Sequence, residues 1–305
     1  MVRTFTQKAW ERHMLNTDGT SALAYAFLYL TVLALWFPSK RRVPFWTFPL
    51  IISIILGYAA GRLTSMALGP LVLLYGSARI LNRAGRPWLR GLSSGVLLVC
   101  GVGLGAHLFP GFHNWKVIDG ALVSQDGIPF TLYLNFDKTL VGIVILGELH
   151  ERIRTRAGWV QMLKSTLSRA PLVIAAVAVL SLMFQFVSFD PKIPEILPLW
   201  AWTNLLFVCV AEEGFFRGFL QKYLAELWQD LRYGQVMALL FASLAFGVAH
   251  LGGGLPYVVL ASVAGLGYGW MYHVTRRIEA SIITHFLLNL FHILMLTYPA
   301  LVPQA

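Results

Sequence analysis

Two adjacent glutamates and an arginine stand in a long apolar segment of the sequence. They are Glu212, Glu213 and Arg217, and the surrounding stretch at about 197–216 has the apolar character of a membrane span. A charged side chain in the hydrocarbon core is costly, so such residues are read first as functional. On a helix Glu213 and Arg217 pair at i and i+4, whereas Glu212 points about 100° away. The spacing predicts a structural Glu213–Arg217 pair and a Glu212 carboxylate that is available as a general base.

Two later apolar segments each carry a histidine at helical spacing from a second distinctive residue. Phe246 precedes His250 by four positions, and His285 precedes Asn289 by four positions. A histidine can share a water molecule with a carboxylate base, and a His–Asn pair can donate N–H groups to an oxyanion. Together with Glu212, these residues predict hydrolysis of an amide bond by activated water, without a covalent intermediate.

The composition places the chain in the membrane class. Of its 305 residues, 57% are hydrophobic and only 12% are charged, about half the charged fraction of a soluble domain. The net charge of +10 raises the question of nucleic acid, but the basic residues stand in short segments between apolar runs. We therefore predict a multi-pass integral membrane protein that contacts the lipid bilayer and binds no nucleic acid.

The hydropathy pattern predicts an all-α polytopic bundle with about 8–10 membrane spans. One stretch, 128–149, is interrupted by Asn135, Asp137 and Lys138, so it is expected to be interfacial or re-entrant if it is not a full span. The segment 110–138 is the most polar connection and is expected to be a loop. The apolar stretches are 21–37, 45–61, 64–80, 91–109, 128–149, 171–189, 197–216, 235–251, 255–274 and 279–298.

The basic residues predict an orientation. With ten spans, alternate connections hold 17 of the 24 Lys and Arg residues, and the opposite side with both termini holds 7. Cytoplasmic loops of membrane proteins carry the excess of Lys and Arg, so the richer loops are expected to be cytoplasmic. These loops are 38–44, 79–90, 150–170, 217–234 and 275–278.

Three motifs in order resemble the signature of a known family. Glu-Glu-x-x-x-Arg at 212–217, Phe-x-x-x-His at 246–250 and His-x-x-x-Asn at 285–289 are similar to those of the CAAX-protease and bacteriocin-processing family. This family, also called ABI or type II CAAX prenyl endopeptidase, consists of glutamic intramembrane proteases. The resemblance covers about 170–298, so we divide the chain into an N-terminal transmembrane region, 1–165, and a protease-like domain, 166–305.

The resemblance implies a role for each motif residue. Glu212 would be the base and His250 would help to hold the water, while His285 and Asn289 would form the oxyanion hole. The remaining residues, Glu213, Arg217 and Phe246, would support the site. No metal or organic cofactor is implied, and the substrate would be a membrane-associated peptide or protein. A prenylated CAAX protein, a bacteriocin-like peptide and a C-terminal sorting signal all remain open, as does the oligomeric state.

Other functions remain as alternatives. Two histidines and a glutamate are also a usual zinc set, although the sequence has no His-Glu-x-x-His motif. Buried polar residues can also line an ion or proton path in a transporter or channel. Some members of the family that the sequence resembles are linked only to bacteriocin immunity or scaffolding.

The predicted helices leave one geometric conflict. Counting the helical rise from the predicted span ends places Glu212 and His285 at a similar depth, but His250 about 14 Å away from them. The Gly252-Gly253-Gly254 run offers a way out, because the helix before it can end inside the protein.

Overall fold

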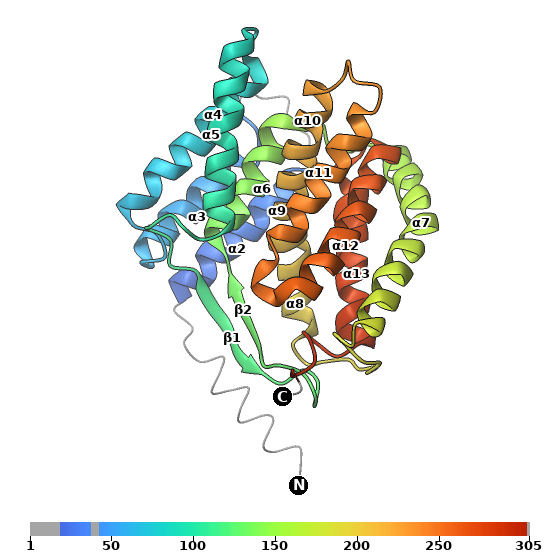
Figure 1. The fold of residues 1–305 in the computed structure, drawn as a ribbon. Coiled ribbons are helices and arrows are strands. Elements are labelled where there is room, and N and C mark those ends of the chain that lie inside the picture. Colours follow the sequence, from blue (N-terminus) through green and yellow to red (C-terminus); the bar gives the residue numbers. More distant parts are fainter. Residues whose placement is uncertain (1–18, 38–42, 304–305) are drawn as a thin grey trace.

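The computed structural model describes residues 19–37 and 43–303, which form a helical bundle with one small β-hairpin (Figure 1). Successive helices run in opposite directions, so their connections alternate between the two ends of the bundle. The helices are α2 Gly19–Ala34, α3 Thr47–Ala59, α4 Leu68–Arg83, α5 Pro87–Gly105, α6 Phe136–Leu149, α7 Arg156–Met183, α8 Leu197–Thr203, α9 Val210–Glu213, α10 Lys222–Leu227, α11 Gly234–Val248, α12 Gly254–Thr275 and α13 Ile278–Met295.

The helices α8, α9 and α10 form one continuous helical segment, 197–227. Two π-helical stretches, Asn204–Cys209 and Gly214–Gln221, join them. With this segment counted once, the described residues contain ten helices, and the predicted all-α polytopic fold is confirmed.

Four helices of the described chain are long and apolar enough to cross a membrane. They are Pro87–Gly105, Arg156–Met183, Leu251–Thr275 (which includes a 3-10 turn at Leu251–Gly253) and Ile278–Met295. Three shorter apolar helices, Gly19–Ala34, Thr47–Ala59 and Gly234–Val248, accompany them. Multi-pass membrane localisation follows from these helices, as the composition predicts.

Two segments differ from the elements that hydropathy predicts. The predicted span 128–149 is divided into strand β2, Phe130–Leu134, and α6, and β2 pairs antiparallel with β1, Trp115–Ala121. Side chains in β2 alternate between more and less exposed positions, as expected for a strand. The summed hydropathy of a stretch does not depend on this alternation, so it could not predict the strand. In addition, α7 begins at Arg156, well before the predicted span at 171. Its start is capped by Thr155, whose hydroxyl accepts a hydrogen bond from Gly158 N at 3.1 Å.

The central helix α6 lies against α9 at backbone distance. A Cβ atom built at Gly142 would lie 2.6 Å from the Cα atom of Ala211, and one built at Gly214 would lie 3.3 Å from the Cα atom of Gly142. Small residues are the usual means of close helix approach in membranes. The closeness brings the first turn of α6 next to the Glu212 side chain.

We expect Gly142→Val to destabilise the protein, because the new side chain must push α6 away from α9. Overpacking of a filled core typically costs about 1–3 kcal/mol. Gly95→Ala in α5 is the matched control, because a Cβ atom at Gly95 meets no atom within 4 Å. Thermal unfolding in detergent should show a lower Tm for Gly142→Val alone. An equal Tm for both variants would contradict close packing at this contact.

The two ends of the bundle differ in charge and structure. We call the upper end in Figure 1 the basic end, since it holds the connections 84–86, 150–155, 228–233 and 276–277. Of the predicted basic loop 38–44, positions 38–42 lie outside the described residues. We call the opposite end the hairpin end, since it holds β1 and β2.

The C-terminal segment ties the connections of the hairpin end together. Leu301 N donates to Phe186 O at 3.0 Å, and Val302 N donates to Asp126 O at 2.9 Å. Nearby, a hydrogen bond with Ser124 and the ammonium group of Lys192 hold the pKa of Asp190 below its ordinary value. The hairpin end is therefore an ordered layer of connections.

Candidate active site

Glu212 and Glu213 lie on α9, between the two π-helical stretches. Their side chains are buried, at 8% and 0% exposed. Segments of π-helix are rare and occur often at functional sites, since they widen one turn and change the direction of the side chains. Arg217 contacts Glu213, as the spacing on a helix predicts, whereas His285 lies 2.8 Å from Glu213 Oε1 and 3.9 Å from Glu212 Oε2.

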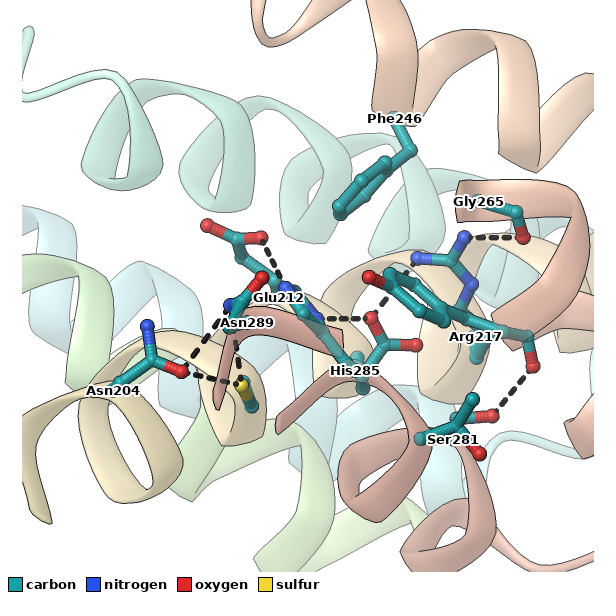
Figure 2. Close-up of polar contacts among 12 residues, drawn as sticks. Asn204, Glu212, Arg217, Phe246, Gly265, Ser281, His285 and Asn289 are labelled. Atoms are coloured by element: carbon teal, nitrogen blue, oxygen red, sulfur yellow. Dashed lines mark hydrogen bonds and ion pairs between the residues drawn. The ribbon is translucent and has the colours of Figure 1, made fainter. Parts of the chain in front are cut away.

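Glu213 lies at the centre of a fully buried polar network. Its Oε1 atom is 3.3 Å from Arg217 Nη1 and 2.8 Å from His285 Nδ1. The other arm of the guanidinium, Nη2, donates to Gly265 O on α12 at 2.8 Å. Figure 2 shows His285 between Glu212 and Arg217. The network joins α9, α12 and α13 and fixes the His285 ring.

Both histidines direct their Nε2 atoms at one oxygen of Glu212. His285 Nε2 lies 3.9 Å from Glu212 Oε2, and His250 Nε2 lies 4.0 Å from the same oxygen. His250 Nδ1 contacts the carbonyl oxygen of Phe246 at 2.7 Å, so in the neutral form of the ring the proton lies on Nδ1 and Nε2 is an acceptor. Among the described residues, no group makes a hydrogen bond to Glu212 Oε2. This oxygen and the two imidazoles therefore face a common point.

The predicted separation of about 14 Å between His250 and its partners is wrong. The prediction assumed that all helices begin at the same depth in the membrane. They do not, so His250 and His285 reach the depth of Glu212 from different starting points. Figure 1 shows the connection before α11 reaching further up than the connection before α13. The offset compensates for the longer distance along α11, which ends at Val248 just before His250.

Aromatic rings hold the histidines in place. Tyr268 stacks on His285, with ring centroids 4.4 Å apart at 15°. Phe246 is 4.6 Å from the His250 ring, and its face lies 4.7 Å from the Arg217 guanidinium carbon. A cation over an aromatic face is stabilised more strongly when both groups are desolvated. Phe246 thus contacts both the buried arginine and a histidine.

Lys138 is the member of the site that motif reasoning missed. Its Nζ atom lies 2.5 Å from Glu212 Oε1, the carboxylate oxygen that faces away from the histidines. Lys138 is in the first turn of α6, far from the three motifs in sequence. The signal was visible as a lysine that interrupts the apolar stretch 128–149, but nothing in the sequence joined it to Glu212.

The first turn of α6 is held by a second polar cluster. Asp137, the neighbour of Lys138, contacts His107 Nδ1 at 2.7 Å and accepts a hydrogen bond from Asn114 Nδ2 at 3.0 Å. Asn114 Oδ1 in turn accepts from Phe136 N at 2.8 Å. These bonds connect the turn before β1 to the start of α6, and they fix the helix end that presents Lys138.

Asn289 lies near His285 but makes a different contact. Its Nδ2 atom donates to Asn204 Oδ1 at 3.2 Å, and Cys209 Sγ donates to the same oxygen at 3.4 Å. Asn289 Nδ2 also lies 4.0 Å from Cys209 Sγ, a weak acceptor, so its second N–H is held only weakly. His292, one turn further on, contacts Thr297 O at 3.1 Å.

A cavity of about 80 Å³ adjoins the polar groups. Its polar lining includes His250, His285, Asn289 and His292. The rest is mostly apolar and comes from α7, α12, α13 and the connection after α7, which is the usual composition of a ligand site. These apolar residues include Ile174, Val177, Phe186, Tyr257, Leu260 and Leu296.

The described part of the chain has no set of side chains that is arranged to bind zinc. No group of three or more His, Cys, Asp or Glu side chains there is arranged to hold a metal ion. Each histidine Nε2 is also further from Glu212 Oε2, at 4.0 and 3.9 Å, than the roughly 3.3–3.6 Å between two ligands of a tetrahedral zinc ion with ligand distances of about 2.0–2.2 Å.

Fold and site together define a multi-pass helical membrane protein with a buried Glu–His centre. Residues 194–291 match the family described as type II CAAX prenyl endopeptidase, Rce1-like. The match confirms the family resemblance that the three motifs predict, and all three lie inside it. It indicates a peptidase of the CAAX type that acts in the membrane. No curated protein and no solved structure matches this chain.

Proposed function

We propose that the chain is a metal-independent glutamic intramembrane endopeptidase. The observation that carries the proposal is the convergence of His250 Nε2 and His285 Nε2 on Glu212 Oε2, at 4.0 and 3.9 Å. A water molecule bound there would donate one proton to Glu212 Oε2 and the other to His250 Nε2, since both atoms are acceptors. Its lone pair is then free to attack a carbonyl carbon.

The reaction balances through these groups. As the water oxygen bonds to the carbonyl carbon, Glu212 takes its proton and the carbonyl oxygen becomes an oxyanion. Asn289 donates its remaining N–H to that oxygen, and protonated His285 donates from Nε2. The proton on Glu212 then passes to the leaving nitrogen, and the C–N bond breaks. Preorganised donors aimed at developing charge are usually the largest single contribution to such catalysis.

Charge balance supports the donor role of His285. Glu212 and Glu213 are countered by Lys138 and Arg217, so these four groups are neutral together. Because Glu213 Oε1 accepts from His285 Nδ1, donation from Nε2 requires a doubly protonated ring. The site then carries one net positive charge, which favours the oxyanion of the tetrahedral intermediate.

A comparison of membrane-protein termini tests the proposed function. Cells with the native protein should produce peptide termini that are absent from cells with Glu212→Ala, at equal levels of the protein. If the two sets of termini are identical, proteolysis loses its support. Loss of uptake of a solute with unchanged termini would instead favour a transporter.

We expect activity to persist in metal chelators, since every step is assigned to side chains and water. Purified protein in detergent, treated with EDTA and then with 1,10-phenanthroline, should keep the rate of the untreated sample within about twofold. The cleaved peptide comes from the comparison of termini. Loss of activity that returns on addition of zinc would restore the metal-dependent alternative, since a zinc site would carry the bound water itself.

We expect Lys138→Met to lower kcat, because Lys138 holds Glu212 Oε1 and so turns Oε2 toward the histidines. A hydrogen bond to a charged group is typically worth about 1.5–3 kcal/mol, which corresponds to roughly a 10–150-fold loss. Lys138→Arg should restore part of the rate, and Lys116→Met in the exposed part of β1 should have none of this effect. A rate that rises in Lys138→Met would show an inhibitory contact instead.

A further inference from the structure

The site is closed toward the basic end of the bundle. Arg217 is fully buried, and Gln221, one turn closer to that end, is 3% exposed. Gln221 Nε2 donates to Gly269 O on α12 at 3.1 Å, which joins the two helices at this level. A polypeptide has no route to Glu212 through this layer.

Toward the hairpin end the site is accessible. The side chains of His250 and Lys138 are 21% and 22% exposed, compared with 9% for Glu212 and 5% for His285. Both of the more exposed residues stand at helix ends that face the hairpin end. Lys138 is in the first turn of α6, and His250 follows the end of α11.

The cavity extends in the same direction. Beyond the histidines its wall is formed by Phe186, Tyr257 and Leu296, which belong to the connection after α7, the start of α12 and the chain after α13. Figure 1 shows that the turn between α11 and α12 stops short of the lower ends of α7 and α13. Leu251 and Leu255 at this turn lie outside the cavity wall and are 57% and 72% exposed. The surface beside His250 is therefore apolar.

The distribution of Lys and Arg residues indicates which side of the membrane the hairpin end faces. The described connections of the basic end hold six arginines, which are Arg86, Arg152, Arg154, Arg232, Arg276 and Arg277. Lys and Arg are enriched in cytoplasmic loops, so the basic end is cytoplasmic. The described connections of the hairpin end hold only Arg62, Lys116 and Lys192. The accessible side of the site is thus the extracytoplasmic side.

We propose that the substrates are exported polypeptides, held by an apolar anchor and cleaved where the anchor meets the outer leaflet. This inference rests on the proposed function and adds the side of the membrane from which the substrate comes. The apolar part of the cavity would receive anchor side chains, and the scissile bond would reach Glu212 past His250 and Lys138. A cytoplasmic lipidated chain would meet the closed layer at Arg217 and Gln221 instead.

Cysteine labelling tests the orientation without removal of the native cysteines. Cys100 and Cys209 are both buried, so a membrane-impermeant maleimide should not reach them. We expect Asp119→Cys in the hairpin to be labelled on intact cells, and Glu226→Cys in α10 only after permeabilisation; these side chains are 58% and 48% exposed. The reverse pattern would overturn the inference and leave the proposed chemistry untouched.

The positions of the cleavage sites provide the second test. We expect the termini that differ between native and Glu212→Ala cells to lie in exported proteins, next to an apolar segment on its extracytoplasmic side. Differing termini in cytoplasmic segments would overturn the inference while they support the proposed peptidase. If no terminus differs, the proposed function fails and this inference fails with it, whatever the labelling shows.

Discussion

Replacing Glu212 with Gln is expected to reduce kcat by about 10²–10⁴-fold, the usual contribution of a general base. The amide keeps the size of the side chain but cannot take the proton from water. The assay is cleavage of a peptide identified from the comparison of termini, with the purified protein in lipid vesicles. Because Glu212 attracts the reacting water, the loss should appear in kcat more than in KM.

Two controls make the Glu212→Gln result specific. Glu195→Gln, in an exposed position of the connection after α7, should keep the native rate. The Tm of Glu212→Gln should stay close to that of the native protein, so that a lost rate is not a lost fold. A variant with native kcat would place the base at another residue and would contradict the proposed mechanism.

Replacing Arg217 with Met is expected to give the largest loss of stability. The Arg217 guanidinium is fully buried, and its removal takes away the permanent cation of the Glu213 carboxylate, which keeps its contact with His285 Nδ1. Breaking a buried ion pair by removal of one partner costs about 3–5 kcal/mol. Unfolding in detergent, followed by circular dichroism, should show this as a large decrease in Tm.

The chain offers a matched control for Arg217→Met. Arg90→Met breaks the pair between Arg90 and Glu226, in which both side chains are about half exposed. Such surface pairs contribute only about 0–1 kcal/mol, so its Tm should hardly change. Adding Glu213→Gln to Arg217→Met should recover part of the lost stability, because it removes the unpaired charge. Equal effects of the two arginine variants would contradict the role of Arg217 as a buried counter-ion.

The sequence could predict the parts of the site that follow from one helix at a time. The pairing of Glu213 with Arg217 depends only on the helical period, and hydropathy was enough to predict an all-α bundle of about 8–10 spans. The depth of His250 could not be predicted, since it depends on where α11 starts relative to its neighbours. The relative depth at which each helix starts depends on tertiary packing, and it cannot be predicted from the lengths of the apolar stretches.

Lys138 illustrates a second limit. Its contact with Glu212 depends on the close approach of α6 to α9 at Gly142, and on the Asp137 cluster that fixes the first turn of α6. Neither is visible as a motif. Strand β2 was missed for a related reason, since a short apolar stretch next to a helix reads as part of that helix unless its alternation is examined. The division into regions 1–165 and 166–305 stays a prediction.

The Lys138–Glu212 contact has a consequence for the order in which the protein is made. Lys138 leaves the ribosome 74 residues before its counter-ion. At about 5–20 residues per second, that interval is roughly 4–15 s. A lone lysine at the centre of a bilayer costs about 2.5–3.5 kcal/mol, and Lys138 avoids this cost if its helix end stays near the membrane surface. We therefore expect the first turn of α6 to reach its final position only after the segment 197–227 arrives.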